Sequence, residues 1–171
     1  MTFVLGRHSY GHIHVRVWTQ PNVVVTTGAF CSFADNIRMV IDGNHPITTF
    51  SSYPFNTIFP DVAANNYGKS IPTIGNDVWI GSDVTLYSGI TIGDGAVIAG
   101  QSVVTKSVPP YAVVAGNPAR IVKYRFDEQT IQDLLEVKWW DLPDSFIRKL
   151  IDVNSDIKEV IRICRDYRST K

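Results

Sequence analysis

The sequence predicts an all-β domain, a parallel β-helix of six-residue repeats, followed by a tail of α-helices. Three observations predict it. Aliphatic residues recur every sixth position in the middle of the chain, an aromatic stretch without any period interrupts the repeats, and the composition changes abruptly near Ala119. The length of 171 residues fits one domain with an appendage.

The repeats are clearest from Ile74, where the chain reads IGNDVW, IGSDVT, LYSGIT, IGDGAV, IAGQSV and VTKSVP. A period of six differs from the period of two that ordinary half-buried strands show. We expect the first position of each unit to point into a narrow core, and Gly, Asn and Asp to occupy turns that need a positive φ. These first positions are all aliphatic: Ile74, Ile80, Leu86, Ile92, Ile98 and Val104.

An earlier block, TGAFCS, FADNIR and MVIDGN, runs from Thr27 to Asn44, with Phe33 and Met39 at its first positions. The six-residue phase does not continue from Met39 to Ile74. Residues 44–72 are therefore predicted to be a loop inserted into a β-helix domain of residues 1–119. Long loops on a rigid scaffold are often functional.

Residues 120–171 form the predicted helical extension, which holds 11 basic and 10 acidic residues but no glycine. Asp127 is the expected N-cap of a first helix, and Pro143 separates it from a second. Asp156 and Glu159 mark the start of a third. The apolar stripes of the three helices are Ile131, Leu134, Leu135 and Trp139; Phe146, Ile147, Leu150 and Ile151; and Ile157, Val160, Ile161, Cys164 and Tyr167.

Composition narrows the range of functions. Sixteen basic and sixteen acidic residues give no net charge, which argues against binding to nucleic acid or to a membrane surface. No apolar run has the length of a membrane span, and the first residues show no signal peptide. Cys31 and Cys164 form no metal or redox motif, so we expect buried thiols in a cytoplasmic protein.

The segments DGNHP, SSYPF, DVWIG and ITIGDGAVIAGQSVVTKSVPPYAVVAGNPAR, with the tail RFDEQTIQDLLEVKWWDLP, resemble the hexapeptide-repeat acyltransferases. Within that family the chain resembles the xenobiotic branch, which includes streptogramin and chloramphenicol acetyltransferases. The resemblance covers about residues 27–145. It implies a left-handed β-helix, a homotrimer with active sites between subunits, and direct acetyl transfer from acetyl-CoA to a hydroxyl or amine.

The resemblance places His45 at the position of the family's general base. Drug-modifying members carry Arg after this His, whereas Pro46 follows it here, and no Gly-Trp element lies between Asn56 and Ile71. Sugar acetyltransferases of the superfamily often have His-Pro at this point. We therefore expect an acceptor that is a sugar, a nucleotide-sugar or a surface-polysaccharide precursor, with an antibiotic such as streptogramin A or chloramphenicol as the alternative.

By the same resemblance, a groove for acetyl-CoA runs along the repeats. Its predicted residues include small ones that give access to the backbone and basic ones that suit the CoA phosphates. They are Gly81, Ser82, Ala99, Gly100, Thr105, Lys106, Arg120 and Lys123. On the acceptor side, the expected residues are Asn44, Tyr53, Phe55 and the outward Trp79, whose other interpretation is packing at the trimer interface.

Two further hypotheses belong to other classes. His8, His12 and His14 could ligate zinc, as in a carbonic anhydrase class that shares the β-helix, although we expect no metal here. The chain could also be a non-catalytic trimeric scaffold, in which nothing would depend on His45.

Overall fold

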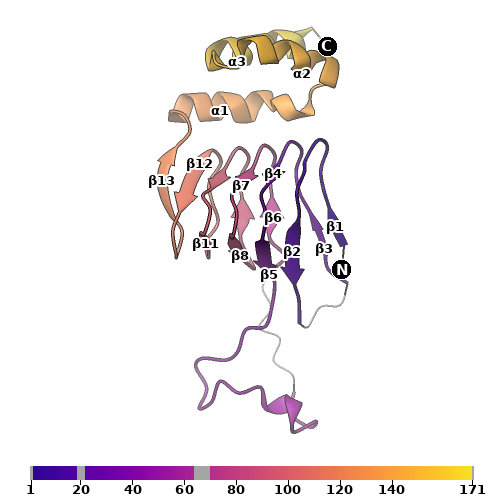
Figure 1. Cartoon of the computed structure of the whole chain (residues 1–171), viewed down its shortest axis with the longest axis vertical. Coiled ribbons are helices and arrows are strands. Elements are labelled where there is room, and N and C mark those ends of the chain that lie inside the picture. The colour runs from indigo at the N-terminus through magenta and orange to yellow at the C-terminus, as the bar shows by residue number, and fades with distance from the viewer. Residues whose placement is uncertain (1, 19–21, 64–69, 171) are drawn as a thin grey trace.

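The structure is a computed structural model, and it describes residues 2–18, 22–63 and 70–170. Its centre is a column of short strands whose successive turns, here called coils, stack side by side (Figure 1). A layer of helices lies along one side of the column, and an extended segment hangs from the opposite side. The column therefore separates the helical layer from the loop predicted to carry the active site.

The strands of the column form three faces, and the strands within each face run parallel to one another. The first face holds β1 (Thr2–Val4), β3 (Val24–Thr26), β6 (Thr73–Ile74) and β9 (Thr91–Ile92), joined by a bridge between Thr27 and Ile74. The second holds β2 (Ile13–Arg16), β5 (Ile37–Val40), β8 (Thr85–Tyr87) and β11 (Val103–Val104). The third holds β4 (Ser32–Phe33), β7 (Trp79–Ile80), β10 (Val97–Ile98) and β12 (Ala112–Ala115).

The strand register confirms the six-residue repeat. Thr73 pairs with Thr91, eighteen positions further along the chain. Thr85 and Val103 on the second face, and Trp79 and Val97 on the third, keep the same separation. In this part of the column, one coil therefore consists of three six-residue units, one for each face, which confirms the predicted six-residue period.

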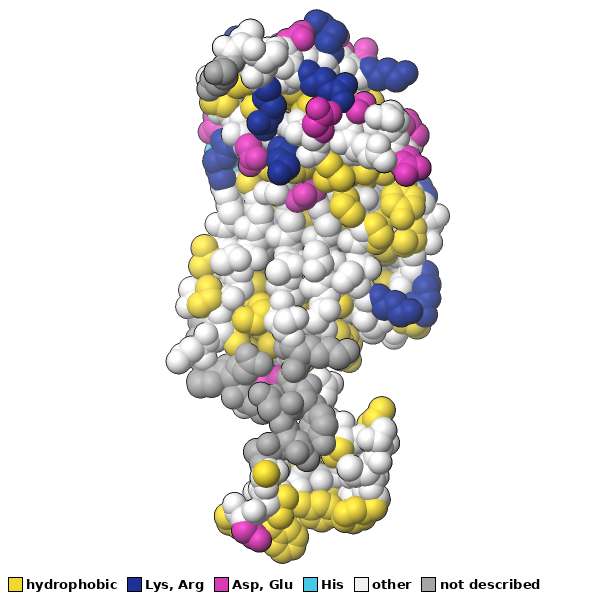
Figure 2. Space-filling view, turned by 180° about the vertical axis from the view of Figure 1, so that it is seen from behind, with side chains coloured by type: hydrophobic (Ala, Val, Ile, Leu, Met, Phe, Trp, Pro, Cys, Tyr) yellow, Lys and Arg dark blue, Asp and Glu magenta, His cyan; other side chains and the backbone are white. Residues whose placement is uncertain are grey.

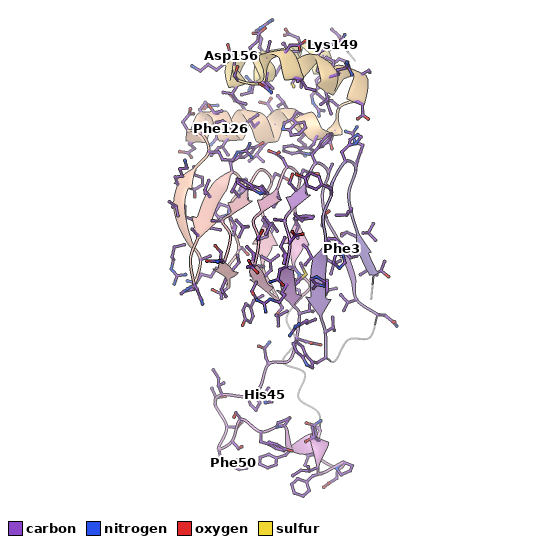
Figure 3. The ribbon with its side chains drawn as sticks, viewed as in Figure 1. Phe3, His45, Phe50, Phe126, Lys149 and Asp156 are labelled. Atoms are coloured by element: carbon purple, nitrogen blue, oxygen red, sulfur yellow. The ribbon has the colours of Figure 1, made fainter. Side chains whose placement is uncertain are left out.

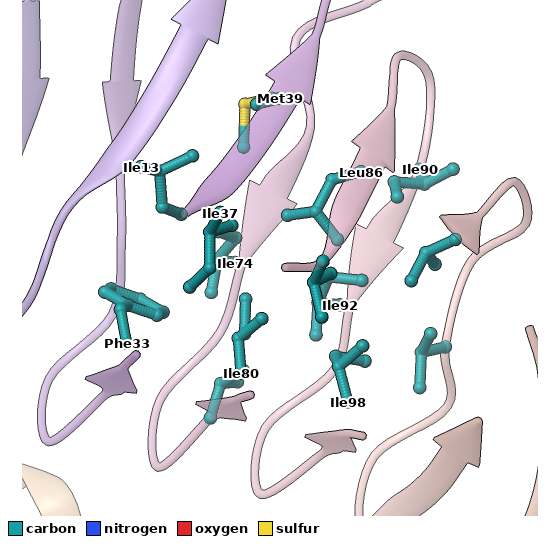
Figure 4. Packing of buried hydrophobic residues seen from close by; sticks show 14 of the residues in the cluster. Ile13, Phe33, Ile37, Met39, Ile74, Ile80, Leu86, Ile90, Ile92 and Ile98 are labelled. Carbon is teal, nitrogen blue, oxygen red and sulfur yellow. The ribbon is translucent and has the colours of Figure 1, made fainter. Parts of the chain in front are cut away.

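The core is a stack of side chains that point into the column from all three faces (Figure 4). Every predicted first position from Ile74 to Val104 is buried, and so are Phe33 and Met39 of the earlier block. The fifth positions of the units point inward as well, including Ser102, whose hydroxyl accepts a hydrogen bond from Gly116. Two inward positions in each unit explain why strands of only two to four residues suffice to build a core.

The inserted loop leaves the column after β5. Arg38 of β5 pairs with Thr85 of β8, so the coils on either side of the insertion still stack in register. Between Val40 and Thr73, the described residues contain only a 3₁₀ helix, Phe55–Thr57. The insertion hangs below the column and does not disturb it (Figure 1).

The helices begin later than the change of composition indicates. Arg120–Tyr124 forms β13, which runs antiparallel to β12 and covers the end of the column. The helical layer then follows with α1 (Glu128–Val137), α2 (Asp144–Leu150) and α3 (Ile157–Ser169), and with 3₁₀ helices at Trp139–Asp141 and Ile151–Val153. The charged composition of residues 120–124 therefore belongs to an exposed edge strand and not to a helix.

Two details of the predicted helices are wrong. Trp139 lies outside α1, because Lys138 adopts a left-handed conformation that ends the helix, and a 3₁₀ helix follows. Ile151 lies outside α2 and is 59% exposed. The predicted caps are confirmed: the Asp127 carboxylate accepts a hydrogen bond from the backbone of Thr130, and Asp156 accepts one from Glu159.

The helical layer packs over one corner of the column. Phe30 and Tyr111 occupy turns there with positive φ, and both belong to a second hydrophobic cluster with Leu134 and Trp140. Asp77 of the same corner forms an ion pair with Arg125, at 2.8 Å. The helical layer thus has a hydrophobic core of its own, separate from the core of the column.

Candidate active site

His45 lies at the start of the hanging segment, and its imidazole is held by one hydrogen bond. Nδ1 lies 2.8 Å from the carbonyl oxygen of Ser52. A carbonyl oxygen only accepts, so Nδ1 is the donor of this hydrogen bond, and in the neutral ring the lone pair is then on the other nitrogen, Nε2. The side chain is exposed, and in the described part of the chain Nε2 meets no hydrogen-bond partner. This is the tautomer that a general base needs.

The segment folds back on itself and forms a hollow of about 210 Å³ beside His45. Aromatic rings build one wall: Phe55 stacks on Phe50 with ring centroids 5.5 Å apart and meets Tyr53 edge-on at 5.3 Å. Asn44 also lines the hollow. The structure therefore brings together four of the predicted site residues, namely Asn44, His45, Tyr53 and Phe55. Figure 3 shows His45 and Phe50 on this segment.

One aromatic residue near His45 was not predicted from the sequence. The indole of Trp18, which follows β2, lies against Gly43, where any β-carbon would come within 2.9 Å of the ring. The backbone N–H of Trp18 donates to the buried carboxylate of Asp42. This packing fixes the chain two residues before His45. Trp18 falls in the weakest stretch of the repeat pattern, and no signal in its own neighbourhood marks it.

The residues predicted to bind CoA lie on the column, at two of its corners. Gly81 and Ser82 follow β7, and Ala99 and Gly100 follow β10, which places them one above another at the corner after the third face. Thr105 and Lys106 follow β11, at the corner after the second face. The loop with His45 leaves from this second corner, because β5 and β11 belong to the same sheet.

Close stacking of the coils gives Gly81 a structural role. A β-carbon on Gly81 would lie 2.6 Å from the backbone nitrogen of Gly100 in the next coil. The absence of a side chain there therefore lets two coils approach each other, whereas the sequence alone predicts a position that a ligand approaches. Ser82 and Gly100 themselves remain exposed to solvent at this corner.

The basic residues predicted for the CoA phosphates lie toward the end of the column. Arg120 and Lys123 belong to β13, in which every residue is exposed. Lys106 is exposed as well. Figure 2 shows Lys and Arg side chains gathered at the right-hand edge of the column. Arg120 donates to the carbonyl oxygen of Ala119, its neighbour in the chain.

One copy of the chain does not assemble all of these residues into a single site. His45 lies on the segment that hangs from the column, away from the strands (Figure 3). Trp79 lies on the outer side of β7, where it is 57% exposed and pairs laterally with Ser32 and Val97. Its exposure fits both functions considered above, an acceptor wall and a packing surface.

Other chemistry finds little support in the described residues. Cys31 and Cys164 are buried and unpaired, and burial raises the pKa of both thiols, which disfavours the nucleophilic thiolate. In residues 2–18, 22–63 and 70–170, no group of three or more His, Cys, Asp or Glu side chains is placed to hold a metal ion. None of the helices in these ranges has the length and apolar character that a membrane crossing needs.

Comparison with known proteins identifies the family. The family model of the bacterial transferase hexapeptide (six repeats) matches residues 71–106. A probable macrolide acetyltransferase from Lysinibacillus sphaericus is 41% identical over 122 residues, which cover 67% of each protein. The chain belongs to the hexapeptide-repeat acetyltransferases. It is therefore an acyltransferase, and its column is the left-handed β-helix of that family, as the sequence predicts.

Other members of the family extend this picture. A chloramphenicol acetyltransferase from Agrobacterium fabrum is 47% identical over 124 residues, and the match covers 68% of this chain but 59% of that protein. The crystal structure of a maltose O-acetyltransferase from Clostridium difficile is 26% identical, with a TM-score of 0.51, over 74% of this chain and 68% of that one. The family thus includes relatives named for antibiotics and for a sugar.

Proposed function

We propose that this hexapeptide acetyltransferase transfers an acetyl group from acetyl-CoA directly to a hydroxyl or amine of its acceptor, with His45 as the general base. The observation that carries the proposal is the position of the imidazole: His45 lines the aromatic hollow, Nδ1 lies against the carbonyl oxygen of Ser52, and Nε2 has no hydrogen-bond partner among the described residues. The ring is thereby held in the tautomer that accepts a proton.

The reaction follows from this geometry. Nε2 takes the proton of the acceptor O–H or N–H as the acceptor oxygen or nitrogen attacks the thioester carbonyl of acetyl-CoA. The tetrahedral intermediate collapses with loss of the CoA sulfur, which receives the proton from the imidazolium. No cysteine is needed as an acyl carrier, in keeping with the raised thiol pKa values of Cys31 and Cys164.

We assign the acetyl-CoA groove to the column, where Ser82, Gly100, Thr105 and Lys106 are exposed. Lys106, Arg120 and Lys123 would pair with the phosphates, because cationic side chains bind phosphate oxygens strongly. We also place the protein in the cytoplasm, on the basis of its two unpaired, buried cysteines.

We propose a homotrimer in which the hanging segment of one subunit meets the column of its neighbour. The segment exposes large apolar side chains, including Ile47 at 90% and Phe50 at 94%. Figure 2 shows hydrophobic side chains gathered along the lower end of this segment. Apolar patches of this kind are typical of interaction surfaces. A neighbouring column would cover them and bring the groove residues to His45.

Two classes of acceptor fit the hollow. A carbohydrate is favoured by the His45–Pro46 sequence and by the aromatic faces of Tyr53 and Phe55, on which a sugar ring can stack. A hydroxyl-bearing antibiotic is the second candidate, favoured by the identities of 41% and 47% to relatives named for macrolides and chloramphenicol.

The test measures release of free thiol from acetyl-CoA with a panel of acceptors. The panel contains amino sugars, nucleotide-sugars, polysaccharide fragments, streptogramin A and chloramphenicol. We expect turnover with one class, and a loss of about 10²- to 10⁴-fold in kcat for His45→Ala, which is the usual contribution of a general base.

The matched control is His8→Ala, since His8 is also an exposed histidine but pairs with Asp144 at the helical layer. This variant should retain activity. Circular dichroism should show that His45→Ala keeps its fold. Full activity of a folded His45→Ala enzyme would remove His45 from the mechanism and favour the scaffold hypothesis.

A further inference from the structure

Cationic side chains gather on the outer side of the second face, at the end of the column opposite to β13. His14 of β2 pairs laterally with Arg38 of β5, so both side chains point outward next to each other. Arg16 lies two residues beyond His14 on the same side of β2. These side chains, with Val15 and Asn36, line a hollow of about 430 Å³.

The two arginines differ from the paired arginines of the molecule. Arg7, Arg125, Arg162 and Arg165 each form an ion pair with a carboxylate. Within the described residues, Arg16 and Arg38 have no carboxylate within 4.0 Å.

Arg38 carries a further signal. Its Nε atom is buried and has no hydrogen-bond partner in the part of the chain that the structure describes. A buried donor without an acceptor is costly, and it is rare in native proteins unless a ligand or an ion supplies the acceptor. The carboxylate of Asp83, at the neighbouring corner, accepts a hydrogen bond from Asn36 instead.

The position of the cluster connects it to the active site. β2 continues from Arg16 to Trp18, whose ring lies against Gly43. β5 continues from Arg38 to the same glycine and on to His45. The cationic hollow and the general base therefore lie on the same two neighbouring strands and their extensions.

We propose that Arg16 and Arg38 bind an oxyanion, a phosphate or a carboxylate, carried by the acceptor. This inference rests on the proposed function, because it assigns the anion to the molecule that His45 deprotonates. A guanidinium presents several N–H donors in one plane and pairs with two oxygens of such a group. Among the carbohydrates, the proposal selects acidic or phosphorylated sugars as acceptors.

The first measurement is direct binding, which needs no catalysis. Titration calorimetry measures the binding of inorganic phosphate, and of citrate as a carboxylate probe. Each anion is titrated into the wild-type chain, the double variant Arg16→Gln/Arg38→Gln and the control Arg148→Gln. Arg148 is an exposed arginine on α2. We expect wild type and control to bind one of the anions, and the double variant to bind it at least about tenfold more weakly.

The second measurement assigns the anion to the acceptor. Glucosamine and glucosamine 6-phosphate differ by one phosphate, and glucose and glucuronate by one carboxylate. Arg38→Gln should raise KM for the charged partner that wild type prefers, and leave KM for the neutral partner and for acetyl-CoA unchanged.

Three results would overturn the proposal. The first is anion binding that is absent or unaffected by the double substitution. The second is a rise in KM for acetyl-CoA in place of the acceptor. The third is dissociation of the assembly by Arg38→Gln, which would make the arginines part of an interface. Loss of anion binding in the double variant, with no acetyl transfer by wild type to any acceptor, would instead contradict the proposed function and leave the anion site standing.

Discussion

Gly81 offers a test of the close stacking between two coils. Gly81→Ala would place a methyl group 2.6 Å from the backbone nitrogen of Gly100. Because backbone cannot move aside as a side chain can, we expect a loss of about 1 to 3 kcal/mol in the free energy of unfolding. Urea denaturation of wild type and variant measures this loss. Ser82→Ala, at the exposed neighbouring position, should unfold like wild type, and equal stability of both variants would argue against the steric role.

The ion pair between Asp77 and Arg125 offers a test that depends on pH. Burial raises the pKa of Asp77, and Arg125 partly offsets this. Arg125→Ala removes that offset and also the hydrogen bond from Arg125 to Gly95, so we expect a loss of about 1 to 3 kcal/mol at neutral pH.

The sign of the pH dependence follows from the raised pKa. A carboxyl group whose pKa is higher in the folded state favours folding below its ordinary pKa of about 4, and loses that contribution as pH rises through the folded-state value. The Arg125→Ala penalty should therefore be smaller near pH 4, where only the lost hydrogen bond to Gly95 remains, than at pH 7. Urea unfolding at the two pH values measures it, and an equal penalty at both would exclude the electrostatic cause.

At the scale of single residues, the sequence predicts well which side chains point into the core, and predicts poorly what the outward side chains do. The period of the repeat predicts that Ile80 and Leu86 are buried, because the inward position of every unit must be apolar. Trp18 and Arg38 have no such periodic signal, since their roles depend on neighbours that are distant in the chain. The role of His45 is predicted by the family resemblance, and Tyr53 is a candidate because it is an aromatic residue in the inserted loop.

Among the elements, α1 connects the helical layer to the column. Leu134 is 2% exposed in the cluster that α1 shares with α3 and with Tyr111 of the corner. We expect Leu134→Ala to destabilise the layer by about 2 to 5 kcal/mol, the usual range for a buried leucine. Hydrogen exchange should show faster exchange in α1 and α3 and unchanged protection of β7 and β10, because the column has a separate core.

An exposed residue of the same helix is the control. Gln132→Ala should leave exchange unchanged, as Gln132 is exposed. If Leu134→Ala loosened the column and the layer equally, the two clusters would be one cooperative unit.

The elements show which signals in the sequence are reliable. The caps at Asp127 and Asp156 were predicted because a single side chain and a single N–H define each of them. β13 was missed because an antiparallel edge strand with every residue exposed has no inward position, and so no period. The early end of α1 depends on the left-handed conformation of Lys138, a residue that rarely adopts it.

For the whole molecule, the prediction concerns assembly. We expect light scattering to give a mass near three times the 19.1 kDa of one chain. Ile47→Ser/Phe50→Ser should weaken the trimer and reduce acetyl transfer together, because these apolar side chains would lie against a neighbour. Ile151→Ser, which changes an exposed isoleucine on the helical layer, should do neither. A wild-type monomer with full activity would contradict the shared site.

The pairing of Arg38 with Thr85 across the insertion has a consequence for how such enzymes diversify. Because the coils on either side stay in register, the column sets no fixed length for the segment that is inserted between them. That segment can grow, shrink or be exchanged without repair elsewhere. Acceptor specificity and the stability of the column can then evolve independently. Selection for a new acceptor can change the inserted segment while the column keeps its stability.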